Sequence, residues 1–287
     1  MVIGIIGLGL IGGSLGRAIR EKTDHRVYGR DRDPATVLKA NLLGATHGEL
    51  TDEILQKADL VVFAVNPRTA VSLLPTVVPL LKKGATVIDC CGNKRIVVTE
   101  MENMKKQYPD VGFIGAHPMA GREFSGVEHS TSHLFEHSFV ILTPVHSSIS
   151  DFEKVKGLFL SVGCDGIQLA TAEKHDKMIS YTSQLAHVLS SSYAKCPLSA
   201  NHAGFSAGSF RDLTRVAKLN PSMWTELFID NADNLTERIQ ELIDRLEEYK
   251  DAIEKKDEQR LRALLQAGVD AKTVAENALK DKKKEEK

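Results

Sequence analysis

Short apolar runs alternate with segments of helical spacing along the first 170 residues of the chain. Residues 11–20 and 69–81 place apolar side chains three and four positions apart, as one buried helix face requires. This alternation is typical of an α/β fold in which helices cover both faces of a doubly wound parallel sheet. The predicted strands span residues 2–6, 26–29, 60–65, 85–89, 111–116 and 139–142.

The pattern changes after about residue 170, where strand-like runs become sparse and the apolar spacing turns to three and four. We predict an all-helical C-terminal part, in which Thr171 caps a helix reaching residue 196 and a second helix spans 201–219. Asn220 and Pro221 supply an N-cap and a first-turn proline for a long third helix. The predicted domains are an α/β domain over residues 1–170 and a helical domain over residues 171–287.

The predicted third helix carries an apolar stripe that must be buried against something. Asn231 is its one polar interruption. Packing within the same chain is one explanation, but the small helical domain has little else to cover the stripe, so we predict a homodimer interface. The stripe consists of Trp224, Phe228, Leu235, Ile239, Leu242, Leu246, Tyr249 and Ile253.

Composition narrows the classes of partner. The 287 residues suffice for about two domains of ~150 residues each. Lys and Arg total 37 against 38 Asp and Glu, and this balance gives no basic footprint for nucleic acid. The longest apolar run, residues 60–65, is far shorter than the ~18 residues of a membrane span. Because the four cysteines form no CxxC pair, we expect a cytoplasmic protein with reduced thiols and a small-molecule ligand.

A glycine-rich loop follows the first predicted strand and opens the first predicted helix. Gly7, Gly9 and Gly12 have the GxGxxG spacing that lets the backbone approach a pyrophosphate at a helix N-terminus, with Leu10 and Ile11 between the last two. Strand, loop, helix and second strand fall within about 30 residues, which favours a Rossmann dinucleotide site over a tight turn in a nucleotide-free domain.

The second predicted strand ends beside Asp31, 19 residues beyond Gly12. A carboxylate at this place accepts hydrogen bonds from the adenosine ribose hydroxyls, and we therefore predict NAD as the cofactor. Arg30 and Arg32 flank it, and either would suit a 2′-phosphate, which leaves NADP as the alternative.

Loops after the next two strands should line the cofactor crevice and flank the nicotinamide. The first contains Val65, Asn66 and Pro67, and the second contains Gly92 followed by Asn93 and Lys94. Loop and helix-cap chemistry is the competing explanation for the polar members.

His117 ends the fifth predicted strand, at the sheet edge where the nicotinamide is expected. An imidazole with an ordinary pKa near 6.5 is well suited to act as a general base there, although a histidine that merely caps the strand is the alternative. His129, His133 and His137 recur every four residues, as metal ligands on a helix do. The serines and threonine between them favour a solvated loop, so we predict no metal site.

Five motifs together resemble the prephenate and arogenate dehydrogenases of tyrosine biosynthesis, and they extend over nearly the whole chain. The motifs are GLGLIGGS at 7–14, HPMAG at 117–121 with Glu123 after it, KHD at 174–176 with SQLAH at 183–187, GSFRDLTR at 208–215, and NPSMW at 220–224.

The resemblance implies oxidative decarboxylation of prephenate to 4-hydroxyphenylpyruvate, with His117 at the ring hydroxyl, His187 and Ser183 in the pocket and Glu123 at its mouth. It also implies that Arg215, or alternatively Arg211, binds a substrate carboxylate. The two arginines lie four apart on one face of the predicted helix.

Many members of the family have a serine that supports the catalytic histidine where this chain has Gly92. Support for His117 must then come from water or a neighbouring polar group, and Asn93 is a candidate. The sequence leaves open whether prephenate or arogenate is preferred. We recognise no regulatory domain in it, so feedback by tyrosine, if present, would have to act at the active site. A β-hydroxyacid or imine reductase is a competing class of enzyme, and an NAD-sensing protein without turnover is a competing class of binding protein.

Overall fold

The computed structural model describes residues 1–285 and divides into two units, Met1–Asn231 and Ala232–Lys287. Among the described residues, no helix has both the length and the apolar character needed to cross a membrane. The predicted boundary at residue 170 marks the end of the nucleotide-binding domain. It differs from the division at residue 231 and stays a prediction.

A seven-stranded sheet forms the centre of the first unit, in the order β2-β1-β3-β4-β5-β6-β7. All neighbouring strands are parallel except β5 and β6, which are antiparallel. The α/β prediction is confirmed, but the expectation of a purely parallel sheet is wrong at this one pair, and the seventh strand was not predicted. The strands are β1 (Val2–Ile6), β2 (Arg26–Arg30), β3 (Leu60–Phe63), β4 (Thr86–Asp89), β5 (Gly112–Pro118), β6 (Phe139–Pro144) and β7 (Gly166–Leu169).

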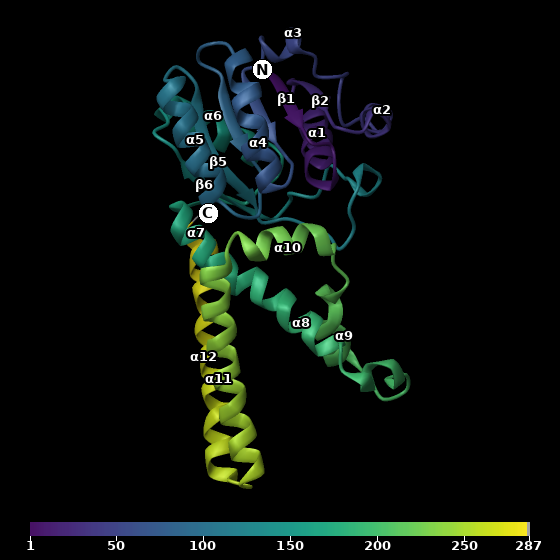
Figure 1. Cartoon of the computed structure of the whole chain (residues 1–287), viewed down its shortest axis with the longest axis vertical. Helices are drawn as coiled ribbons and strands as arrows, with labels where there is room; N and C mark the ends of the chain where they lie inside the picture. The colour runs from purple at the N-terminus through teal and green to yellow at the C-terminus, as the bar shows by residue number, and fades with distance from the viewer. Residues whose placement is uncertain (286–287) are drawn as a thin grey trace. The chain divides into compact units, whose positions relative to one another are not determined.

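Helices bury both faces of this sheet (Figure 1). On one face, Leu15 and Ile19 of α1 (Leu10–Lys22) join Phe159 of α6 (Ile149–Ser161) in a core cluster. On the other, α4 (Pro67–Val77) and α5 (Arg95–Gln107) build a second cluster. Shorter segments complete the layer: α2 (Pro34–Leu42), α3 (Asp52–Leu55) and the 3-10 turns η1 (Val78–Leu80) and η2 (Val127–His129).

The helical part begins as predicted, because the Thr171 hydroxyl accepts a hydrogen bond from the Lys174 amide at the start of α7. The second predicted helix over 201–219 is wrong: it is broken into short turns around Gly204, whose φ of 83° lies in the left-handed region. The segments are α7 (Ala172–Ile179), a π-helical turn η3 (Ser180–Leu185), α8 (Ala186–Ala194), η4 (Pro197–Asn201), α9 (Gly208–Thr214), η5 (Arg215–Ala217) and α10 (Pro221–Ile229).

The prediction of a single long third helix is also wrong. Its predicted start is confirmed, because the Asn220 side chain accepts a hydrogen bond from the Met223 amide. The chain leaves the helix at Asp230 and Asn231, and α11 starts at Ala232. Asn231 is fully buried, and its side-chain amide donates to the Asp176 carbonyl at 2.9 Å and to Gln184 Oε1 at 2.8 Å. These tertiary hydrogen bonds outweigh the continuous helical pattern.

The second unit is a hairpin of α11 (Ala232–Glu254) and α12 (Glu258–Glu285), which lie side by side (Figure 1). The Tyr249 hydroxyl donates to the Leu264 carbonyl across the pair at 3.0 Å. Several stripe residues remain uncovered in the single chain, with Leu246 53% and Ile253 59% exposed.

Candidate active site

The glycine-rich loop has the geometry of a phosphate cradle. Gly7 adopts a φ of 93°, and a Cβ at Gly12 would collide with the Gly7 carbonyl oxygen, so neither position admits a side chain. A Cβ at Gly9, by contrast, would meet no atom within 4 Å. The open space therefore lies next to Gly9, where the N-terminus of α1 at Leu10 and Ile11 faces out, and it suits a pyrophosphate.

Asp31 is fixed beside this loop at the end of β2. Its carboxylate accepts hydrogen bonds from the Leu8 amide at 2.8 Å and from the Asp33 amide at 3.0 Å. The Arg30 guanidinium points elsewhere, because it donates to the Leu50 carbonyl and pairs with Asp52 at 2.7 Å. The residues therefore fit a dinucleotide with free ribose hydroxyls better than one with a 2′-phosphate.

Two loops follow the carboxyl ends of β3 and β4, and the first of them contacts the glycine loop, since a Cβ at Gly7 would meet Ala64 and Val65. Asn66 is the exposed N-cap position of α4, Pro67 is buried behind it, and the Val65 carbonyl accepts a hydrogen bond from the Cys91 thiol at 3.3 Å. In the second loop, a Cβ at Gly92 would come 3.1 Å from Leu227 Cδ2 of α10.

A fully buried ion pair joins Asp89, at the end of β4, to Lys94. The Asp89 carboxylate also accepts from the amides of Ala116 at 3.0 Å and Cys91 at 2.9 Å. Burial raises the pKa of the Cys90 and Cys91 thiols, so both stay protonated and unreactive at neutral pH.

His117 is the second-last residue of β5; its side chain is half-buried and contacts the buried polar pair of His175 and Asp176. Its Nδ1 is 2.8 Å from Nε2 of His175, and Nδ1 of His175 is 2.7 Å from the Asp176 carboxylate. Burial lowers the pKa of His117 well below its ordinary value, and the Lys94 ammonium acts in the same direction; a positive charge on His175 would lower it further, but a neutral His175 carries none. Burial likewise lowers the pKa of His175. Both imidazoles are therefore neutral at physiological pH, as a general base must be.

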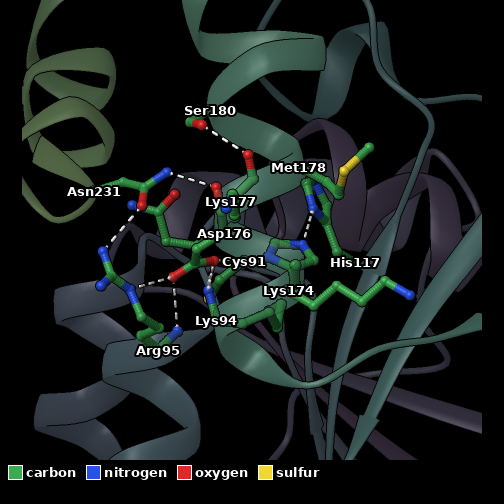
Figure 2. Close-up of polar contacts among 12 residues, drawn as sticks. Cys91, Lys94, Arg95, His117, Lys174, Asp176, Lys177, Met178, Ser180 and Asn231 are labelled. Atoms are coloured by element: carbon green, nitrogen blue, oxygen red, sulfur yellow. Dashed lines mark hydrogen bonds and ion pairs between the residues drawn. The ribbon is translucent and has the colours of Figure 1, made fainter. Parts of the chain in front are cut away.

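Asp176 occupies the centre of the contacts drawn in Figure 2. Its carboxylate accepts from the backbone amides of Lys94 at 2.7 Å and Arg95 at 3.0 Å, and the Arg95 guanidinium also contacts Asn231. Burial alone would raise the pKa of Asp176, but the hydrogen bonds from His175 and these two amides outweigh it and hold the pKa below its usual value. Asp176 is thus a buried anion.

The predicted pocket residues of the helical part lie together. Ser183 is in the π-helical turn, and its carbonyl is 2.9 Å from Nδ1 of His187. The His187 ring stacks on Trp224 with a centroid distance of 3.7 Å. Burial lowers the pKa of His187, and the charge of Arg215 acts in the same direction.

Arg215 forms an ion pair with Glu123, 92 residues earlier in the chain. The competing local pair of Arg215 with Asp212 is not formed, since Asp212 faces Arg211 at 3.7 Å. Arg211 is the more exposed, with 82% of its side chain accessible against 63% for Arg215. The predicted continuous helix through both arginines is interrupted between them, because α9 ends at Thr214 and Arg215 opens a 3-10 turn.

The hypothesis that Asn93 supports His117 is wrong. Its side-chain amide donates to the Leu227 carbonyl at 2.8 Å, and its oxygen accepts from Gln184 at 3.0 Å. His175 and Asp176 belong to one of the family motifs, yet the sequence alone assigned neither of them a role. The available signal was a histidine and a carboxylate in the first turn of a predicted helix.

The three regularly spaced histidines lie in a turn region and not on one helix face. His129 closes the 3-10 turn η2 and stacks on Phe124, whereas His133 pairs with Glu136 at 2.8 Å. His137 has a φ of 61° and directs its ring to Asp165. The loop prediction for this segment is confirmed.

Comparison with known proteins agrees with this geometry. Residues 15–167 match the family model described as prephenate dehydrogenase, nucleotide-binding domain, and residues 171–267 match prephenate dehydrogenase, dimerization domain. A cyclohexadienyl dehydrogenase of Zymomonas mobilis is 31% identical over 277 residues, 89% of this chain and 89% of that protein. A prephenate dehydrogenase of Lactococcus lactis is 30% identical over 277 residues, 92% of this chain and 74% of that protein.

A solved structure of prephenate dehydrogenase from Aquifex aeolicus, in complex with hydroxyphenyl propionate and NAD+, has a TM-score of 0.81 and 29% identity. The match covers 96% of this chain and 98% of that one. The NAD+ of that enzyme agrees with the cofactor expected here from Gly9 and Asp31. The predicted oxidoreductase class is confirmed, and the chain belongs to the prephenate dehydrogenase family, with both its nucleotide-binding and its dimerization domain.

Proposed function

We propose that the protein catalyses NAD-dependent oxidative decarboxylation of prephenate to 4-hydroxyphenylpyruvate. The observation that carries this proposal is His117, a neutral imidazole near the carboxyl end of β5, at the same sheet edge as the dinucleotide loop after β1 and the crevice loops after β3 and β4. Family membership supports the reaction class.

The cofactor is held by residues of the first unit. The amides around Gly7, Gly9 and Gly12, with Leu10 and Ile11 at the start of α1, bind the pyrophosphate, and Asp31 binds the adenosine ribose. NAD, when bound, accepts a hydride. Val65, Asn66, Pro67 and Gly92 of the two crevice loops would flank its nicotinamide.

His117 Nε2 draws the proton from the C4 hydroxyl of the cyclohexadienol. As the hydride leaves C4, the bond from the ring to its carboxylate breaks, CO2 departs, and its electron pair completes the aromatic ring. Aromatisation drives the reaction, so the protein supplies mainly position, a base and a cation. Arg215 is that cation for a substrate carboxylate, with Arg211 as the alternative, and His187, Ser183 and Glu123 surround it.

Arogenate is the alternative substrate, since it differs only in carrying an amino group where the side chain of prephenate has a keto group. The similarity to a cyclohexadienyl dehydrogenase is compatible with either compound. The uncovered apolar stripe and the dimerization-domain match support a homodimer. Cytoplasmic location stays a prediction.

The test is direct. Purified protein is mixed with NAD or NADP and with prephenate or arogenate, and absorbance at 340 nm is followed, with His117→Asn as the control. Turnover with NAD and prephenate at the highest kcat/KM supports the proposal. A higher kcat/KM with arogenate would transfer the assignment to arogenate dehydrogenase, and no turnover of either would overturn the proposal.

A further inference from the structure

Residue 92, in the loop after β4, is glycine and therefore offers no side-chain hydroxyl to His117. Asn93 does not replace it, since both ends of its amide are bound to Leu227 and Gln184. The polar partner that the structure places on the His117 ring is His175, at 2.8 Å from Nδ1.

The charge of Asp176 determines which ring nitrogens of His175 and His117 carry a proton. Asp176 is ionised and can only accept, so Nδ1 of His175 must carry a proton and donate it. A neutral imidazole has one N–H, which leaves Nε2 of His175 as an acceptor. Nδ1 of His117 then donates to it, and Nε2 of His117 keeps its lone pair for the substrate.

We propose that His175 and Asp176 are positioning residues that hold His117 in the tautomer with Nδ1 protonated and stabilise the imidazolium formed when its Nε2 accepts the substrate proton. This proposal rests on the proposed function, and it names the groups that tune its base. No proton has to move from His117 to His175 or Asp176 during this step. The hydrogen bond from His117 to His175 persists, and the Asp176 carboxylate strengthens it through its own bond to His175.

The groups packed around His117, His175 and Asp176 hold these side chains in place and include few charges. His117 faces His175 and the Lys94 ammonium, and Lys94 is itself neutralised by Asp89. His175 faces Asp176, Lys94 and Asp89. The Asp176 carboxylate is clamped by two backbone amides at the start of α5, so its position is set by the main chain.

A structural role alone would also explain a buried Asp176, because it joins α7 to the loop before α5. Loss of stability is therefore no test. The discriminating properties are the tautomer of His117 and the pH dependence of kcat, since neither has to change when packing alone is lost.

The experiment uses the full-length protein labelled with 15N-histidine, as wild type, His175→Ala, His175→Gln and the control Lys177→Gln. Lys177 is exposed on the same helix and takes no part in the site. Imidazole 15N spectra should show His117 protonated at Nδ1 in the wild type and in the control. In His175→Ala the Nε2-protonated form should become dominant, whereas His175→Gln, whose amide oxygen can still accept, should retain part of the Nδ1 form.

With prephenate and NAD, His175→Ala should lower kcat by about 10- to 1000-fold while KM and the NAD Kd change little. In His175→Ala the acid limb of the kcat–pH profile should move to lower pH, because the hydrogen bond that favours protonated His117 is lost. An unchanged His117 tautomer in His175→Ala overturns the proposal, as does an unchanged acid limb. The spectra require no turnover, so this result is separate from failure of the proposed function.

Discussion

Removing the Arg215 guanidinium tests the assignment of the carboxylate anchor. In the structure Arg215 pairs with Glu123, and both side chains are partly exposed, at 63% and 39%. An ion pair so open to solvent is weak, so exchanging Glu123 for a substrate carboxylate costs little. Substrate binding then gains the free energy of the ion pair between Arg215 and the substrate carboxylate, which strengthens when the bound ring excludes water.

Breaking a hydrogen-bonded charge pair in a dry site typically costs ~2–5 kcal/mol. Because Arg215 keeps much of its surface in water, the lower end applies, and about 2 kcal/mol corresponds to roughly 30-fold in KM. We therefore expect Arg215→Ala to raise the KM for prephenate by about 30-fold or more. Arg215→Lys should restore little, since an ammonium does not reproduce the two-pronged guanidinium.

Arg211→Ala is the matched control, because Arg211 is the more exposed and contacts only its neighbour Asp212 at 3.7 Å among the described residues. Its KM should change by less than about 3-fold, as for a surface charge. Initial rates at 340 nm with saturating NAD give the KM values, and calorimetry gives the Kd for NAD, which should be unchanged in both variants. A larger effect from Arg211→Ala would move the anchor to Arg211, and two mild variants would place it elsewhere.

Four further predictions follow from the same geometry. His117→Asn should lower kcat by ~10²–10⁴ without weakening NAD binding in calorimetry; a near-normal kcat would remove His117 from the mechanism. Because the neutral form of His117 is active and its pKa lies well below the ordinary value, kcat should stay level as the pH falls through 6.5 and decline only at lower pH; a decline centred at 6.5 or above would contradict the assignment. Asp31→Ser should narrow or reverse the preference for NAD in kcat/KM with Arg32 nearby, and a wild type that prefers NADP would refute the role of Asp31. Sedimentation should give twice the mass of one chain, while Leu246→Glu should shift the protein toward monomer; a wild-type monomer at micromolar concentration would refute the dimer interface at this stripe.

The features that could be predicted from the sequence are those set by local chemistry. The glycine loop and the cap at Thr171 depend on residues close in sequence, so spacing alone identifies them. Strand β7 was not predicted because Gly166–Leu169 is short and only partly buried. Its alternation of apolar and polar residues is too brief to distinguish from a loop. The reversed direction of β6 is a property of the chain path, and strand patterning does not encode it.

The features that could not be predicted depend on partners distant in sequence. Asn231 looked like a flaw in an apolar stripe, but Asp176 and Gln184, about 50 residues earlier, bind its amide and turn the chain. His175 is 58 residues from His117, and nothing in the local sequence says that the two rings meet. A polar residue that breaks a buried pattern is therefore a reason to search for a buried polar partner.

Two buried carboxylates explain how the base and the cofactor loop keep one geometry. Asp89 holds the Cys91 amide and the Ala116 amide, so it joins the loop after β4 to the strand that carries His117. Asp176 holds the other end of that loop through Lys94 and Arg95. Burying such charges rarely adds net stability, because desolvation offsets their attraction. Their effect is positional: the loop that carries Gly92 is fixed at both ends, and one of its clamps is also the last member of the chain that orients His117.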